Sequence, residues 1–342
     1  MPPHWPFPAS STLIESTSSI ESSASIEAIP TSIESTSIEP ILIQSVVNVP
    51  PEDCTKYEPI TEIPEQPVSA GCFPVFPAGE SVLAVVRQAI AGAPQFVERR
   101  HDHWLAYDYV SLLPGLFEGP HAAVRRELRG LLVCPSRGVV LARRFHKFFN
   151  LSELPETRPH SLPPITNDDA VVLEKLDGSL VSPVVAADGS LHWASRGSPT
   201  PAVALFVAAQ HPRCGYLALV EEALRKGYTA LFEWRCTQST VGVIAASSDS
   251  LTLLALRHLE NGLYLPHRLL CGLASAFRVP CARSFSLSEI FNLPPSPSPL
   301  FSSSPSSDST VTSLARQVRK WNNAEGVVVR WESSGLMVKV KS

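Results

Sequence analysis

The chain has 342 residues, of which 44% are hydrophobic, and its formal net charge is −4. This length is enough for one large domain or two small ones. The first fifty residues contain no lysine or arginine, so neither a secretory signal nor a transit peptide is predicted. Because no apolar run approaches the roughly 18 residues of a membrane span, we expect an intracellular protein of the cytoplasm or nucleus, without a membrane partner.

The charge is distributed unevenly along the chain. Residues 1–90 carry two basic and eleven acidic residues, whereas the remainder carries 26 basic and 21 acidic ones. A mildly basic folded part permits a nucleotide or nucleic-acid partner without requiring one. The seven cysteines include no C-x-x-C pair. Their odd number and wide spacing argue against a zinc site or a disulfide framework, so we expect buried free thiols.

The N-terminal part of the chain has the composition of a disordered segment. Residues 9–40 repeat a short unit of Ser, Thr, Ile and Glu, and a proline-rich stretch follows. We therefore expect a disordered Ser/Thr/Glu/Pro-rich tail and linker over residues 1–78. A single folded domain is expected over residues 79–342, beginning near Gly79.

The expected elements of the first half alternate between helix and strand. Apolar periodicity predicts a helix at 80–91, a strand at 104–113 and a hairpin at 127–142. The basic and aromatic segment 143–150 has two interpretations, a surface loop with a buried Phe pair or a phosphate-binding segment. Two Asp-Gly pairs follow within 171–189, and each is a strong hairpin signal between apolar runs.

The second half continues the same mixture of elements. The pattern predicts strands at 191–198, 228–234, 251–256, 326–331 and 335–341, helices at 214–227 (capped by Gly227) and 314–321, and a flexible Ser/Pro-rich insertion at about 287–313. Because most strands are joined by hairpins, we expect an α+β domain of antiparallel sheets flanked by helices.

One lysine stands out because of its position next to a turn. Lys175 follows an apolar run and precedes Asp177-Gly178, which is the pattern of a lysine nucleophile at the end of a strand. On its own, the motif more often marks only a hairpin. The order of the other segments around Lys175 shifts the interpretation from a hairpin toward a lysine nucleophile.

Seven segments occur in a fixed order around this lysine. They are 127–130 (ELRG), 147–151 (KFFNL), 175–179 (KLDGS), 195–198 (SRGS), 232–234 (FEW), 325–326 (EG) and 339–341 (KVK). The succession resembles the covalent nucleotidyltransferases, a superfamily that includes ATP-dependent ligases and mRNA capping enzymes. The first two segments, with 227–233 (GYTALFE) and 253–264 (LLALRHLENGLY), narrow the resemblance to single-strand RNA ligases of the T-even bacteriophage type. It covers about residues 96–342 and implies an ATP-dependent-ligase-like nucleotidyltransferase domain.

The resemblance assigns the chemistry to three lysines. Lys175 is implied as the nucleophile that forms lysyl-AMP from ATP. Lys339 and Lys341 alternate along the last expected strand, so both would face one side and stabilise the α-phosphate. Neighbouring cations would also lower the pKa of Lys175, which must lose its proton before it can attack. A solvated strand face is the alternative for the last two lysines.

A second group of residues is implied to bind the nucleotide. It consists of Arg129, Lys147, Phe149, Asp177, Gly178, Arg196, Glu233 and Glu325. Arg129 and Lys147 match the positions for the outer phosphates. Glu233 and Glu325 would hold a divalent metal or the ribose, while Phe149 would stack on adenine or belong to the core.

The implied activity is that of an ATP-dependent RNA ligase acting in tRNA or RNA repair. It would join RNA 3′-hydroxyl and 5′-phosphate ends through lysyl-AMP and RNA-adenylate, with ATP and Mg²⁺ (or Mn²⁺), and we expect a monomer. The alternatives are a catalytically dead or truncated RNA-binding module, or another nucleotidyltransferase such as a DNA ligase or capping enzyme.

Two departures from the phage pattern bear on substrate selection. Ser239-Thr240 stands where the pattern has Asn-Arg, which would weaken contacts to substrate or nucleotide. The sequence also stops at Ser342, directly after the last lysine motif, without the family's C-terminal helical domain for tRNA. A minimal catalytic module and an incomplete sequence both remain open, and tRNA selectivity is in question.

Overall fold

The computed structural model describes residues 56–65, 73–166, 168–196, 198–237, 247–291, 310–322 and 324–342. Contacts divide the chain into two units, Met1–Asn48 and Val49–Ser342, and all described residues belong to the second. Most of the expected tail, Ser239-Thr240 and the middle of the expected insertion lie outside the described residues. Among the helices of the described part, none is long and apolar enough to cross a membrane.

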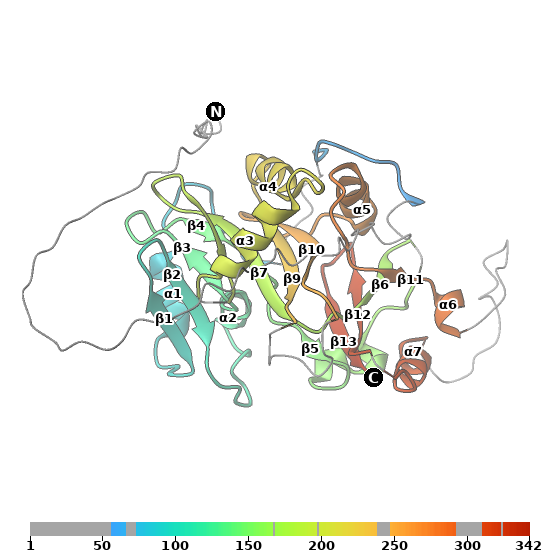
Figure 1. The fold of residues 1–342 in the computed structure, drawn as a ribbon. Coiled ribbons are helices and arrows are strands. Elements are labelled where there is room, and N and C mark those ends of the chain that lie inside the picture. The colour runs from blue at the N-terminus through green and yellow to red at the C-terminus, as the bar shows by residue number, and fades with distance from the viewer. Residues whose placement is uncertain are drawn as a thin grey trace, which may run out of the picture. The chain divides into compact units, whose positions relative to one another are not determined.

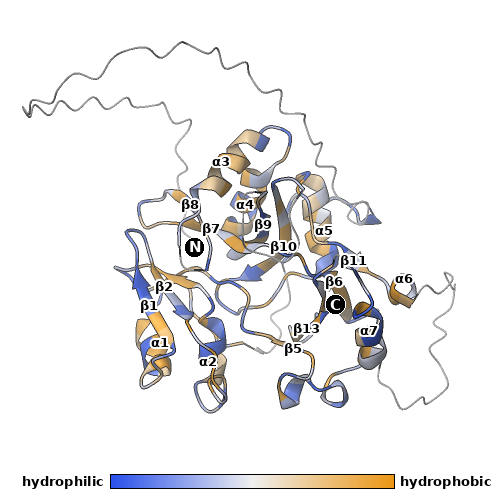
Figure 2. Cartoon of the chain, turned by 60° about the horizontal axis from the view of Figure 1, so that its bottom comes forward, coloured by the Kyte–Doolittle hydropathy of each residue, from blue (hydrophilic) through white to orange (hydrophobic). Residues whose placement is uncertain are grey.

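The first sheet confirms the helix, strand and hairpin expected at 80–91, 104–113 and 127–142, and it adds one strand and one helix that the sequence patterns had not predicted. It has the antiparallel order β1-β2-β3-β4. Its elements are α1 (Leu83–Ile90), β1 (Phe96–Arg100), β2 (Leu105–Tyr109), α2 (Ala122–Glu127), β3 (Leu131–Val133) and β4 (Val140–Ala142). Helix α1 is amphipathic, as the two colours of its ribbon show in Figure 2, and its Val86 is buried in the core of this sheet. That core positions the end of α2, from which the first site segment starts.

The second sheet lies beside the first and carries three helices. Its order is β10-β9-β7-β8, again antiparallel. The elements are β7 (Ser179–Val185), β8 (Leu191–Ala194), α3 (Pro201–Gln210), α4 (Tyr216–Arg225), β9 (Tyr228–Arg235), β10 (Ser250–His258) and α5 (His267–Ala276). Helices α4 and α5 lie beside this sheet (Figure 1). They bury residues such as Leu219 and Leu270 in one core with Phe232 of β9. Gly227 follows α4 with a φ of +76°, which agrees with its expected capping role.

The third sheet is built from segments that are far apart in sequence. Its order is β11-β6-β12-β13-β5, and only the β13–β5 pair is parallel. The elements are β5 (Phe149–Asn150), the 3-10 turns η2 (Pro155–Thr157) and η3 (Pro159–Ser161), β6 (Ala170–Glu174), β11 (Ser284–Phe285), α6 (Leu287–Phe291), α7 (Thr310–Val318), β12 (Gly326–Trp331) and β13 (Met337–Lys341). Helix α7 packs Leu314 and Val318 in one core with Val327 and Val329 of β12.

The two Asp-Gly pairs have different structures. Asp188-Gly189 closes a β7–β8 hairpin, and Gly189 has a φ of +85°. Asp177-Gly178 does not close a hairpin, because β6 and β7 on its two sides belong to different sheets. Lys175 therefore lies on a crossover between the third and second sheets. Helices α3 and α5 are further findings that the sequence patterns had not predicted.

The described residues before Gly79 already belong to the fold, so the expected start of the domain is too late. Ile63 is buried in the core of the second sheet, and its N–H donates to the Glu222 carboxylate at 2.8 Å. Phe76 is buried in the core of the first sheet, and its N–H donates to the Glu260 carbonyl at 2.9 Å. The expected insertion is likewise too long, because α6 and the start of α7 lie inside it.

Candidate active site

A cavity of about 490 Å³ lies where the crossover meets the second and third sheets. Eight of the eleven residues expected at the site line it: Arg129, Lys175, Asp177, Gly178, Arg196, Glu233, Glu325 and Lys339. The three that do not are Lys147, Phe149 and Lys341. Residues more than 200 positions apart in sequence are thus brought together around one space.

Lys175 lies directly after β6 of the third sheet and is held there by the neighbouring strand β12. Its backbone N–H donates to the Gly326 carbonyl at 3.0 Å, and its ammonium forms an ion pair with Glu325. Both side chains are 19% exposed, so the pair is reachable from the cavity. Gly326 has a φ of +124°, and a Cβ there would lie 2.1 Å from the Val340 carbonyl oxygen. Glycine is therefore required beside Glu325 for β12 to approach β13 this closely.

Glu233 faces the same lysine from β9. Burial raises the pKa of Glu233 to about 7, although Lys175 and Arg129 act in the opposite direction. The backbone N–H of Gly178 donates to this carboxylate. A Cβ on Gly178 would lie 2.5 Å from the Trp234 carbonyl oxygen, so only glycine lets the crossover lie this close to β9. A cation placed in the cavity would favour the ionised form of Glu233.

Lys339 extends into the cavity from β13. Its Nζ donates to the Phe148 carbonyl at 3.1 Å and lies 4.6 Å from the centre of the Phe148 ring. Burial, together with Arg129, Lys147 and Lys175, lowers the pKa of Lys339 to about 7. Its proton is held weakly until an anion arrives. Lys341 is exposed and does not line the cavity, so the structure does not bring it to the site with Lys339.

Arg196 approaches the cavity from the turn after β8. Its guanidinium forms an ion pair with Asp108 of β2 at 2.5 Å and lies 5.0 Å from the ring of Tyr109. Asp108 is buried, which makes it a firm anchor for Arg196. Neither partner was expected from the sequence. The available signal was an acidic residue inside an apolar strand, YDY, where an exposed face was the simpler interpretation.

Lys147 and Phe149 lie behind the residues that line the cavity. Lys147 is buried with its Nζ 4.6 Å from the Phe149 ring, and burial lowers the pKa of Lys147. Phe149 packs 5.7 Å from Phe117 in the core of the first sheet. Phe149 therefore belongs to the core and does not line the cavity. Phe145 and Phe148 line the cavity instead, and the FHKFF pattern could not distinguish among its aromatic rings.

The basic segment after β4 is internal rather than a surface loop. Arg143 and Arg257 are fully buried and pair with Glu127 at 2.9 and 2.8 Å. Burial alone would raise the pKa of Glu127, but the two guanidinium groups outweigh it and hold that pKa at about 2. Three residues of the ordered segments, Glu127, Arg257 and Tyr264, thus form an internal cluster in which Arg257 lies 5.0 Å from the Tyr264 ring. This cluster fixes the chain just before Arg129.

These features define a class of site: a lysine paired with a carboxylate, a second buried carboxylate and several cations around one cavity. Such a set suits covalent transfer of a charged group to lysine. The sequence model described as RNA ligase, of the phage T4 type, matches residues 127–342. The chain belongs to this RNA ligase family.

Individual relatives agree with the family. A protein named as a candidate RNA ligase of Thermovibrio ammonificans is 28% identical over 186 residues, which are 54% of this chain and 47% of that protein. RNA ligase 1 of bacteriophage TS2126 is 32% identical over 195 residues, 55% of this chain and 47% of the phage protein. The alignments with these curated relatives therefore span about half of their length. Among solved structures, an archaeal ATP-dependent RNA ligase matches with 15% identity and a TM-score of 0.49 over 76% of this chain and 64% of that one.

Proposed function

We propose that this protein is an ATP-dependent RNA ligase that forms a lysyl-AMP intermediate on Lys175. The observation that carries the proposal is the Lys175–Glu325 pair at a cavity that also holds Glu233, Arg129 and Lys339. Membership of the RNA ligase family supports the reaction class. A volume of about 490 Å³ lies within the usual range of small-molecule sites.

The first step is attack of Lys175 Nζ on the α-phosphorus of ATP. A bond forms between nitrogen and phosphorus, the bond from phosphorus to the bridging oxygen breaks, and pyrophosphate leaves. The ammonium gives up two protons to solvent in the process, one before the attack and one as the phosphoramidate forms, and the nitrogen keeps the third. In the free protein the side chain of Lys175 is engaged in an ion pair with Glu325. The amine can therefore attack only after this ion pair has opened.

The carboxylates give the site a place for a divalent cation. Glu233 and Glu325 are hard oxygen ligands of the kind that Mg²⁺ and Mn²⁺ take, and the raised pKa of Glu233 is the mark of a buried carboxyl without a sufficient counter-charge. A bound Mg²⁺ or Mn²⁺ would supply charge neutralisation at the phosphates. Arg129 and Lys339 would hold the phosphate oxygens, and Arg196, kept in place by Asp108, would extend this cationic wall.

The second and third steps require RNA. AMP would pass from Lys175 to an RNA 5′-phosphate, and the 3′-hydroxyl of a second end would then displace AMP. The mildly basic balance of residues 91–342, with 26 basic and 21 acidic residues, is compatible with a polyanionic partner. We propose no specific tRNA substrate.

The test is incubation with α-labelled ATP and Mg²⁺, followed by a denaturing gel. We expect a covalent label on the wild type that pyrophosphate removes, and no label on Lys175→Ala. Lys320→Ala, which replaces an exposed lysine away from the cavity, is the matched control and should label normally. A folded wild type without label would reject the proposal in favour of a binding-only module. Joining of RNA strands with 5′-phosphate and 3′-hydroxyl ends then distinguishes an RNA ligase from a capping enzyme or a DNA ligase.

A further inference from the structure

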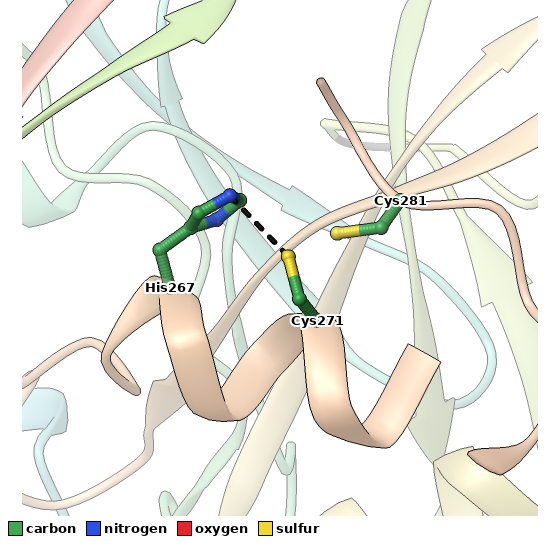
Figure 3. A group of neighbouring side chains, drawn as sticks. All are labelled: His267, Cys271 and Cys281. Carbon is green, nitrogen blue, oxygen red and sulfur yellow. Dashed lines mark hydrogen bonds between the residues drawn. The ribbon is translucent and has the colours of Figure 1, made fainter. Parts of the chain in front are cut away.

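A second group of chemically active side chains lies in the core of the second sheet, apart from the residues assigned to ATP. His267 and Cys271 are one turn apart on α5, and Cys281 approaches them from the segment before β11 (Figure 3). One donor atom from each of the three lies within 4.8 Å of the other two. All three residues are buried, with exposures of 3%, 1% and 2%. The carboxylates of the candidate active site do not belong to this cluster.

We propose that His267, Cys271 and Cys281 bind one zinc(II) ion that stabilises the fold next to the cavity. Two thiolates and one imidazole are the soft and borderline donors that zinc prefers. With metal–sulfur and metal–nitrogen distances of about 2.3 and 2.0 Å, tetrahedral ligands lie about 3.5 to 3.8 Å apart. The distance between Cys271 Sγ and His267 Nε2 is already 3.3 Å. Small side-chain movements would therefore bring the donor atoms to positions from which all of them can bind one ion.

Charge balance favours a zinc(II) complex with two thiolates over a cation without anionic ligands in this apolar part of the core. Cys271 and Cys281 lie among the leucines and valines of the core, where an unbalanced charge is costly. A zinc(II) ion that displaces the two thiol protons leaves a complex without net charge. Cys271 and Cys281 would each lose one proton to solvent, and the imidazole would bind through its neutral form. The fourth position of the ion is left to a donor other than the His, Cys, Asp and Glu side chains of the described residues.

The surroundings indicate what the ion would stabilise. Ala282, the residue after Cys281, lines the cavity, and its N–H donates to the Leu253 carbonyl at 2.9 Å. At the other end, the N–H of His267 donates to Glu332 at 2.6 Å, and Glu332 pairs with the cavity residue Arg330 at 2.7 Å. A metal bridging α5 and Cys281 would therefore tie together two parts of the cavity wall.

The sequence pattern alone argues against a zinc site. Without a C-x-x-C pair, no zinc site is expected. His267 and Cys271 acquire a common face because four residues make about one helical turn, and Cys281 joins them only through packing of the chain after α5. The alternative is that two thiols and an imidazole simply fill the core.

Cobalt(II) is the probe that separates these alternatives in the full chain after removal of metals with a chelator. We expect thiolate-to-cobalt charge-transfer absorption in the near ultraviolet that saturates at one equivalent and is abolished by added zinc. Zinc should also raise the thermal unfolding midpoint. Absence of the saturable band, or a zinc addition without effect on the midpoint, would overturn the proposal.

Variants assign the band to these side chains. Cys281→Ala and His267→Gln should weaken cobalt binding by at least about 100-fold, whereas Cys214→Ala, which removes a buried thiol from the same core, should bind as the wild type does. If Cys281→Ala does not fold, His267→Gln and the wild-type titration still decide. Cobalt binding of wild-type affinity in His267→Gln would contradict the assignment. Labelling with ATP is not needed for any of these readouts, so failure of the ligase proposal would leave them unchanged.

Discussion

At the scale of single residues, the candidate site contains buried ionisable groups whose charged forms are disfavoured before any ligand is present. Glu233 and Lys339 both have a pKa near 7, reached from opposite directions because burial disfavours the charged form of each. Both positions were expected from the sequence as site residues. The shifts themselves depend on burial and on neighbours such as Arg129, which only the fold supplies.

The weakly held proton of Lys339 predicts a pH dependence of nucleotide binding. Because bound phosphates favour the ammonium, affinity should be highest below pH 7 and fall, by at most about tenfold per pH unit, as the pH rises through the pKa of free Lys339. Lys339→Arg keeps its charge and should flatten the fall between pH 7 and 9. Calorimetry with an ATP analogue that has a methylene between the α- and β-phosphorus measures this without transfer.

The matched control for this profile is Lys341→Arg. Lys341 is two residues along the same strand but outside the cavity, so its variant should keep the wild-type profile. If Lys339→Arg loses affinity between pH 7 and 9 as steeply as the wild type, Lys339 is not the group that titrates.

At the scale of elements, the crossover 175–178 contributes more to the arrangement of the site residues than any single strand does. It leaves the third sheet after β6 and joins the second at β7, so Lys175 faces carboxylates of both sheets. The sequence predicted a hairpin or a nucleophile at this point. Local turn chemistry could not distinguish between the two, because the strands on either side pair with distant residues, Glu174 with Val327 and Ser179 with Trp234.

Gly178→Ala should impair lysyl-AMP formation by at least about tenfold while the protein still folds. Its Cβ would lie 2.5 Å from the Trp234 carbonyl oxygen and move the crossover away from Glu233. The rate of labelling by α-labelled ATP measures the effect. Gly189→Ala is the control at the other Asp-Gly turn, where nothing lies within 4 Å and only the positive φ is strained. That variant should cost about 1 to 2 kcal/mol of stability and label normally. Normal labelling by Gly178→Ala would contradict the predicted role of close packing.

At the scale of the whole molecule, the described residues before Gly79 complete two of the hydrophobic cores. Ile63 and Phe76 are 2% and 3% exposed, and they belong to different cores. Composition had suggested a linker here, because proline and polar residues surround isolated apolar ones. A single buried side chain leaves no periodic signal, so its role emerges only from packing.

A chain that begins at Gly79 should therefore be less stable than one that begins at Lys56. Among the described residues, this truncation removes two buried side chains, Ile63 and Phe76, worth about 1.5 to 3 kcal/mol each. Urea unfolding of the two chains measures the difference in midpoint. Ile63→Ala in the full chain, expected to cost about 2 to 4 kcal/mol, shows whether the effect comes from this core contact. Equal midpoints for the two truncated chains would restore the boundary at Gly79.

The sequence by itself determined the α+β class and most strands, because apolar periodicity is a local property. Its ordered motifs resemble those of phage-type RNA ligases, and this resemblance implied eight of the residues that line the cavity. The tertiary structure decided which residues share the cavity and which belong to the core. It separated Lys339 from Lys341 and Phe148 from Phe149, placed Asp108 beside Arg196, and brought Cys281 to His267 and Cys271. Such distinctions depend on which segments pack together, and this is a sum over distant contacts that no short pattern contains.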